Sequence, residues 1–252
     1  MAGKKYRCRE IVERWIVEGN LQLGTPAHFG NGDSDELTDM PLLVDDIEGP
    51  LPLLTGASLA GALRAYLGER EFGYTAGGYG ADVEAGSKTV GLFGMCSGQD
   101  DGEQSHLIIE DALGVVESIE RRHGVGIQRK SRTAENERLY DTHLWAAGTT
   151  FPLRFELLIT RGRDSLSLRQ SLATALHGLN DGSITLGMRK RRGFGKVIVQ
   201  DWRVRCFDLR KQDDLLSWIE QGADKLGEKF QQSDLRALYD GELLPDQRRW
   251  FS

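Results

Sequence analysis

The stretch TTFPLRFELLITRGRDSLSLRQSLATALHGLN, from Thr149 to Asn180, decides the fold because it joins a strand pattern to a helix pattern. Its first part, Thr149–Thr160, is rich in β-branched and aromatic residues, as strands are. In its second part leucines recur at helical spacing, and Gly182 follows as a helix stop signal. These leucines are Leu168, Leu172, Leu176 and Leu179. We therefore predict a strand followed by a helix.

The same succession occurs near the beginning of the chain. The segment IVERWIVEGNLQL, Ile11–Leu23, mixes β-branched and aromatic residues with partial alternation, which predicts a strand. Further on, ASLAGALRAYLGER places four apolar residues on one face of a helix that Thr55 or Ser58 would cap. These four residues are Leu59, Leu63, Tyr66 and Leu67.

Two more strands complete the order of elements. They are predicted at HLIIEDALGVVESI, His106–Ile119, and at VIVQDWRVRCF, Val197–Phe207. The whole order is β-α-β-β-α-β, which predicts an α+β, ferredoxin-like (RRM-like) fold, the arrangement of RNA-recognition domains. Because many unrelated functions use this fold, the order of elements does not decide the function.

We expect one enlarged domain over residues 1–207, followed by a C-terminal helical extension over residues 208–252. Two insertions interrupt the domain, at about residues 73–102 and 120–142. The first is rich in glycine, and the second, RRHGVGIQRKSRTAENERLYD, lengthens a connection between strands. Insertions of that length are usually functional or disordered. The extension contains one predicted helix, DDLLSWIEQGADKLGEKF.

The composition limits the classes of protein to consider. The chain of 252 residues has 38 acidic and 32 basic residues and a net charge of −6, so any binding of nucleic acid must depend on a local patch. The three cysteines are far apart and none forms a C-x-x-C pair, which argues against a disulfide framework and a zinc site. Without a signal peptide or an apolar run of about 20 residues, we expect a soluble, cytoplasmic protein with no membrane partner.

A dense cluster of cations lies in LGMRKRRGFGKVIVQ, residues 186–200. Its members repel one another, so the cluster requires either a solvated surface or a bound anion. Glycines expose backbone N–H groups, and guanidinium groups fit phosphate oxygens. Two interpretations remain open, a phosphate-binding loop and an exposed hairpin with incidental charge. The cations are Arg189, Lys190, Arg191 and Arg192.

Two other segments have unusual charge. The acidic segment GNGDSDELTDMPLLVDDIEGP is not an EF-hand, because Thr38 replaces the required glycine and the terminal glutamate is missing. One aspartate there could instead hold a divalent metal or orient an attacking 2′-hydroxyl, while most of the others are solvated loop residues. The second insertion is basic, and it is either a mobile surface loop or an RNA contact. Its cations are Arg121, Arg122, Arg129, Lys130, Arg132 and Arg138.

Five short motifs, in a fixed order, carry a family resemblance. They are His28-Phe29-Gly30 with Asp39-Met40-Pro41, Gly56-Ala57-Ser58-Leu59-Ala60-Gly61 with Arg64, LFG ending at Gly94, IIEDA ending at Ala112, and GMRKRRGFGKV. Together they resemble the RAMP superfamily, and within it the backbone subunits of type III CRISPR effector complexes. The resemblance extends to about Phe207. It departs from the family at Ala60, where lysine is common, and the cations of residues 189–192 are a conjectural replacement.

The resemblance implies a subunit that binds a guide CRISPR RNA and holds target RNA opposite the guide. Along the guide it would assemble into a filament with copies of itself and with other effector subunits. It implies that Asp39 binds a divalent metal, Mg or Mn, and cleaves the target. The insertion over Gly124–Tyr140 resembles the family's thumb, which wedges into the guide–target duplex. The implied RNA-binding residues are His28, Ser58, Arg64, Arg129, Arg132, Arg189, Lys190, Arg191 and Arg192.

Two alternatives to this function remain. The first alternative is a catalytically silent structural subunit. The second is a guide-processing ribonuclease that works without metal through His28 as general base. No tyrosine or lysine lies near His28 in the sequence to assist such a base. Cleavage in the presence of a chelator would distinguish the second alternative from the metal-dependent enzyme.

Overall fold

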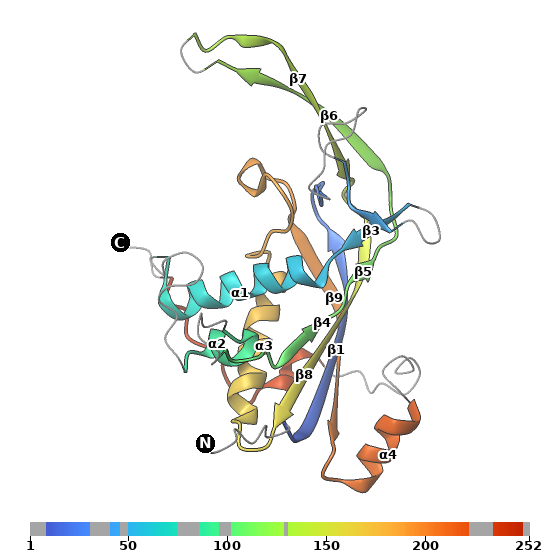
Figure 1. The fold of residues 1–252 in the computed structure, drawn as a ribbon, viewed down its shortest axis with the longest axis vertical. Coiled ribbons are helices and arrows are strands. Elements are labelled where there is room, and N and C mark those ends of the chain that lie inside the picture. Colours follow the sequence, from blue (N-terminus) through green and yellow to red (C-terminus); the bar gives the residue numbers. More distant parts are fainter. Residues whose placement is uncertain are drawn as a thin grey trace, which may run out of the picture.

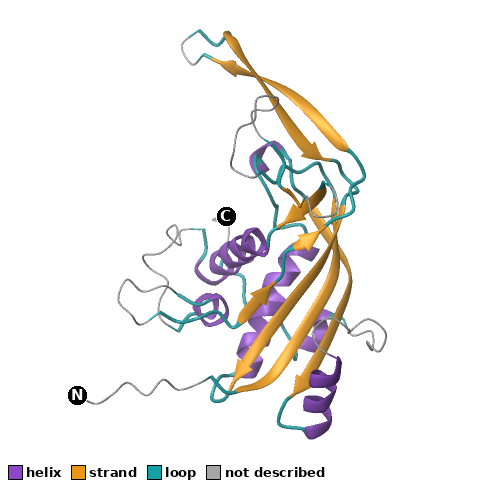
Figure 2. Cartoon of the chain, turned by 45° about the vertical axis from the view of Figure 1, so that its right-hand side comes forward, coloured by secondary structure: helices purple, strands orange, loops and turns teal. Residues whose placement is uncertain are grey.

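A four-stranded antiparallel sheet with the order β4-β8-β1-β9 forms the centre of the fold, and two long helices pack on one face of it (Figures 1 and 2). The computed structural model describes residues 9–30, 41–45, 50–74, 86–95, 102–128, 131–221 and 234–248. The central elements, in chain order, are β1 (Ile11–Leu23), α1 (Gly56–Phe72), β4 (Leu107–Ile109), β8 (Thr150–Thr160), α3 (Ser165–Asn180) and β9 (Val197–Asp208). This order confirms the predicted ferredoxin-like fold.

The core lies between the sheet and the two helices. All four apolar residues predicted for one face of α1 are buried, and so are the four leucines of α3. Thr55 caps α1, because its hydroxyl oxygen accepts a hydrogen bond from the Ser58 N–H at 3.2 Å. The helices approach closely at Gly178, where a Cβ would lie 2.6 Å from the Tyr66 ring. Period and capping thus placed both helices correctly.

The predicted strand over His106–Ile119 is wrong in its length. The chain forms β4 and then β5 (Ala112–Leu113), which pairs with β3 (Leu51–Leu54) rather than with the main sheet. Two contacts explain the break. Asp111 accepts a hydrogen bond from the Gly56 N–H at 2.7 Å, and Gly114 packs against Phe151, where a Cβ would lie only 2.7 Å from the ring. A short strand β2 (Val44–Asp45) pairs with β3.

The second insertion is a long two-stranded hairpin. Its strands, β6 (Ile119–Ile127) and β7 (Ala134–Trp145), pair in antiparallel register and project away from the core, as Figure 1 shows. Of the two alternatives left open for this segment, the paired strands favour an ordered element over a loop without secondary structure. The first insertion contains one short helix, α2 (Lys88–Phe93), and its remaining residues 75–85 and 96–101 lie outside the described ranges.

The C-terminal extension contacts both faces of the sheet. Helix α4 (Gln212–Gln221) packs behind the sheet, where the ring of Trp218 meets that of Phe207 at 5.3 Å between centroids. The 3-10 helix η3 (Leu235–Leu238) lies instead against α3, with both of its leucines buried. The predicted helix extends to residue 230, of which residues 222–230 lie outside the described ranges. The domain boundaries stay predictions.

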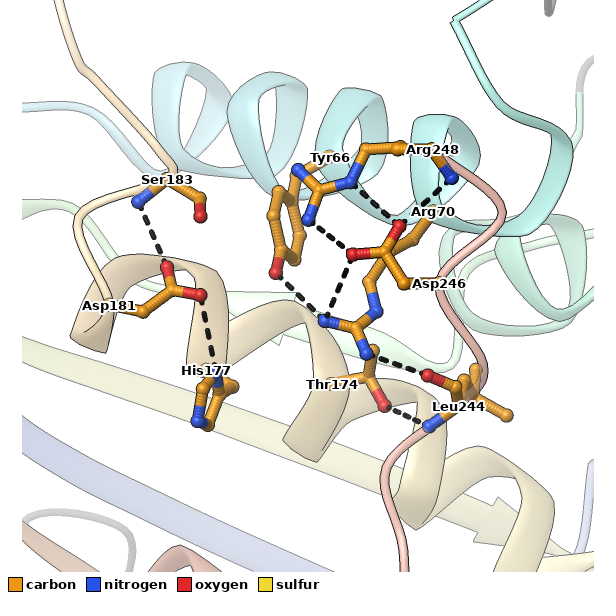
Figure 3. Close-up of polar contacts among 9 residues, drawn as sticks. All are labelled: Tyr66, Arg70, Thr174, His177, Asp181, Ser183, Leu244, Asp246 and Arg248. Carbon is orange, nitrogen blue, oxygen red and sulfur yellow. Dashed lines mark hydrogen bonds and ion pairs between the residues drawn. The ribbon is translucent and has the colours of Figure 1, made fainter. Parts of the chain in front are cut away.

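The last described residues tie α1 to α3 (Figure 3). Arg70 of α1 donates a hydrogen bond to the Leu244 carbonyl at 2.7 Å, and the Leu244 N–H donates to the Thr174 hydroxyl of α3 at 3.1 Å. Asp246 pairs with Arg248 at 2.7 Å, and this hydrogen bond lowers the pKa of the Asp246 carboxyl to about 2. The pair therefore stays ionised at neutral pH.

Candidate nucleic-acid interface

A cleft of about 450 Å³ brings together three of the segments that carry motifs. One wall is the early loop, His28–Gly30, which leaves β1. The second wall is the first half of α1, including Ser58 and Gly61. The third is the glycine-rich loop, from Leu186 to Lys190, which precedes β9. Segments that are up to about 160 residues apart in the sequence thus form one concave surface.

Gly187 of the third wall and Gly195 further along the same loop serve the packing of the chain itself. Gly187 has a φ of 82°, and a Cβ there would overlap the His28 carbonyl oxygen. Gly195 has a φ of 74°, and a Cβ there would overlap the Leu186 carbonyl oxygen. Packing of the chain against itself therefore requires glycine at both positions. Gly193, with a φ of 86° and open space around it, ends a 3-10 turn, η1 (Lys190–Arg192).

The four cations of this loop have different surroundings. Lys190, Arg191 and Arg192 are exposed, and their side chains make no hydrogen bond or ion pair with any residue that the structure describes. Lys190 also lines the cleft. Arg189 is half-buried, and its guanidinium carbon lies 4.9 Å from the centroid of the Tyr140 ring on β7. Three neighbouring cations thus remain available to an anion, whereas the fourth has an aromatic partner.

His28 connects the early loop to the hairpin. Its side chain is buried, with 1% of the residue exposed, and its Nδ1 lies 2.7 Å from the His143 carbonyl oxygen on β7. The Ala27 and Trp145 backbones pair beside it, with the Ala27 N–H donating to the Trp145 carbonyl at 3.0 Å. The structure therefore gives His28 a role in positioning the cleft wall, and its contact with RNA stays a prediction.

The predicted residues of α1 lie at and beside the cleft. Ser58 is exposed in the first turn and accepts a hydrogen bond from the Thr55 hydroxyl at 2.9 Å. The N-terminus of this 17-residue helix carries the positive end of its dipole, and its first N–H, of Gly56, already donates to the Asp111 carboxylate at 2.7 Å. Arg64, one turn after Gly61, is half-buried, and its guanidinium has no polar partner within the described ranges. Of these two α1 residues, Ser58 thus lines the cleft, and Arg64 carries a charge that no described carboxylate compensates.

Two cations of the hairpin arms whose side chains the structure describes, Arg121 and Arg122, pair with carboxylates. Arg121 pairs with Asp141, with a distance of 3.0 Å from Nε to Oδ2, and this hydrogen bond lowers the pKa of the Asp141 carboxyl. Arg122 pairs with Glu120 at 2.7 Å. Arg132, near the end of the hairpin, is exposed and makes no side-chain ion pair with the described part of the chain. Of these three arginines, Arg132 is therefore the one whose charge remains available to RNA.

Two of the predicted site residues, Asp39 and Arg129, lie outside the described residues. The residues that flank the acidic loop are described: Gly30 and Leu42 form a β-bridge at the cleft, and the Leu43 N–H donates to the Phe29 carbonyl at 2.7 Å. Within the described ranges, no group of three or more His, Cys, Asp or Glu side chains could hold a metal ion. The predicted metal ligand therefore stays a prediction.

The open face of the sheet is not a base-stacking platform. RNA-recognition domains stack bases on aromatic residues at this face. Here Arg154 bridges Glu18 at 2.6 Å and Glu110 at 3.0 Å, and Arg203 joins Glu18 at 3.1 Å. The only aromatic among the exposed large apolar residues that the structure describes is Tyr74, just after α1. RNA therefore has a better site at the cleft than on the sheet.

The family model for the RAMP superfamily matches residues 20–198, which include all three cleft walls and the hairpin. The chain belongs to the RAMP superfamily. This membership makes it a CRISPR-associated RNA-binding protein. The search of curated proteins found no match to the chain. No helix in the described ranges has both the length and the apolar character needed to cross a membrane.

Sequence reasoning missed one residue at this interface. Tyr140 marked only the end of the thumb-like segment, but its ring contacts Arg189 from the basic loop. The contact depends on the register of β6 and β7, which places Tyr140 opposite Gly124. No signal in the local sequence specifies that pairing.

Proposed function

We propose that this RAMP protein is a backbone subunit of a type III CRISPR effector complex, which binds guide CRISPR RNA and cleaves complementary target RNA. The observation that carries the proposal is a cleft walled by three family motifs, with Lys190, Arg191 and Arg192 exposed beside it. In a protein with a net charge of −6, this local patch provides the cationic surface that a phosphate backbone requires.

Guide binding of this kind does not read sequence. Lys190 contacts phosphate oxygens at the cleft, next to Arg191 and Arg192, while base pairing with the target supplies specificity. The projecting hairpin acts as a thumb against the guide–target duplex, with Arg132 near its end. Other effector subunits and further copies of this chain are the protein partners along the guide.

Cleavage is assigned to the acidic loop. We propose that Asp39 binds a divalent cation, Mg²⁺ or Mn²⁺, whose charge would stabilise the negative charge that develops on the target phosphate. In support, the loop begins and ends at the cleft, because Gly30 and Leu42 are paired there. The metal-independent alternative depends on His28, and its burial leaves little of the ring accessible to a 2′-hydroxyl.

The direct test is purification of the complex from its native host, followed by sequencing of the bound RNA. We expect RNAs of defined length that share a constant repeat-derived part and differ in the rest. Recovery of random cellular RNA, or of none, would contradict a guide-binding role. The same preparation shows which other subunits accompany the chain.

Binding of single-stranded RNA to the purified full chain should depend on salt and not on sequence. If three loop cations neutralise three phosphates, the logarithm of the affinity falls with the logarithm of salt concentration with a slope of about −2. Between 50 and 200 mM salt the affinity therefore drops by about 20-fold. Filter binding with two unrelated RNA sequences measures both effects, and a slope near zero would exclude the phosphate contacts.

A further inference from the structure

Three residues from two distant segments form a stack at the junction of the hairpin and the core. Tyr140 on β7 lies directly opposite Gly124 on β6. A Cβ at Gly124 would overlap the Tyr140 ring, so the ring lies across the glycine. The guanidinium of Arg189 then lies 4.9 Å from the centroid of the same ring. This distance is within the range of a cation–π contact.

The backbone of Arg189 is held in an unusual conformation. Its φ is 55°, in the left-handed region that costs free energy for a residue with a Cβ. The neighbouring Met188 N–H donates to the His28 carbonyl at 3.0 Å, and the Arg189 carbonyl accepts from the Arg192 N–H at 2.8 Å. These bonds fix the direction in which the side chain leaves the loop. The contact with Tyr140 helps to offset the cost.

A second connection lies three residues further along β7. There the His143 carbonyl oxygen lies 2.7 Å from Nδ1 of His28, in the loop that also accepts the Met188 N–H. The hairpin is therefore held by its backbone at His143 and at Trp145, which pairs with Ala27, and by a side chain at Tyr140. The two backbone attachments lie at the base of the hairpin, and the Tyr140 contact adds a third one further out along β7, which restricts bending about that base. Figure 1 shows the hairpin projecting from the core beyond this junction.

We infer that Arg189 is a positioning residue, which sets the direction in which the hairpin leaves the core through its contact with the Tyr140 ring. It is thereby distinguished from Lys190, Arg191 and Arg192, which have no described partner and face solvent. The consequence for RNA rests on the proposed function: a hairpin held at one angle distorts the guide–target duplex at one place, and a loosened hairpin does not.

The direction of the hairpin can be measured on the full chain without RNA. Spin labels on genetically encoded residues at Ile127, near the end of the hairpin, and at Glu69, on the exposed side of α1, report the distance between the two elements. In Arg189→Ala, the fraction of molecules outside the native distance range should rise about two- to five-fold, the change expected for loss of an exposed cation–π contact. Tyr140→Leu should give the same change.

Two control variants separate this contact from general effects. Tyr140→Phe keeps the ring and should retain the native distance distribution. Arg191→Ala removes the same charge from the same loop and should also retain it. A native distribution in Arg189→Ala, or equal broadening in Arg191→Ala, would overturn the inference. Both outcomes are independent of any activity on RNA.

The assembled complex tests the consequence. In Arg189→Ala the cleavage positions on a target should spread over neighbouring nucleotides, while guide retention stays close to that of the unchanged protein. If the complex does not cleave target RNA at all, the proposed function fails, but the label distances still decide whether Arg189 positions the hairpin. Unchanged, single cleavage positions together with a broadened distance distribution would show that the hairpin direction does not control the cut.

Discussion

Asp39→Ala should abolish cleavage of target RNA by the assembled complex and leave guide binding and assembly unchanged. Loss of the ligand that holds the cation removes stabilisation of the transition state worth several kcal/mol, so we expect a fall of about a thousandfold or more in the cleavage rate. A charged side chain in an acidic, polar segment of the sequence is not expected in the apolar core, so folding should be preserved. The rate is measured on complexes matched for guide content by native mass spectrometry.

The control variants for this prediction are Asp33→Ala and Asp35→Ala, which remove carboxylates from the same acidic loop and should keep cleavage. If either one is inactive while Asp39→Ala cleaves, the catalytic carboxylate lies further upstream. Removal of divalent cations with a chelator should have the same effect as Asp39→Ala. Cleavage that persists in chelator would instead favour the metal-independent alternative with His28 as base.

The sequence predicted the helices correctly, because their buried residues recur at the helical period. The leucines of α3, such as Leu172 and Leu176, and those of α1, such as Leu63, follow the helical period because one face of each helix packs on the sheet. The ordering of these helices with β1, β8 and β9 then specified the ferredoxin-like arrangement. Local pattern sufficed because each of these elements meets the same core along its whole length.

The strand predicted over His106–Ile119 failed because its residues meet different partners. Leu107 pairs in the main sheet, whereas Ala112 pairs with β3, and between them Asp111 binds the first N–H of α1. The apolar, β-branched pattern of this segment does not indicate that the chain leaves the sheet in its middle, where Asp111 binds the N-terminus of α1. The tertiary contact overrides the local preference.

The sequence predicted which residues belong to the candidate site. It did not predict which of them bind other residues of the protein and which remain available to RNA. The sequence shows all cations alike. The register of the hairpin pairs Arg121 with Asp141, Arg122 pairs with Glu120, and the fold places Arg189 on Tyr140, so the protein itself engages three of these cations. Packing of the chain against itself requires glycine at Gly187 and Gly195. Such assignments depend on contacts between segments that no local pattern specifies.

The double variant Arg191→Ala with Arg192→Ala should weaken guide retention and shorten the filament. Both side chains are exposed on η1 and lack a described partner, so their removal leaves no buried charge unpaired and should not destabilise the fold. Each lost charge-assisted contact costs about 1.5–3 kcal/mol in a well-ordered site. For the pair, guide affinity should fall by about 10²- to 10⁴-fold.

The matched control is the double variant Arg121→Ala with Arg122→Ala. It removes the same two charges, but from residues whose guanidinium groups already pair with Asp141 and Glu120. Guide retention in this control should change far less, because these arginines offer little uncompensated charge to a phosphate. A general effect of net charge would instead lower retention equally in both variants.

Native mass spectrometry follows the number of subunits on each guide, and cleavage is then expressed per intact complex. If the basic loop binds the guide while the acidic loop acts on the target, the activity per intact complex should stay constant in the Arg191 and Arg192 double variant, and only the yield of complexes should fall. Normal assembly with full guide occupancy would show that the cluster is an exposed loop with incidental charge. Arg129 and Arg132 of the second insertion would then be the better candidates for holding RNA, because Arg121 and Arg122 already pair with carboxylates.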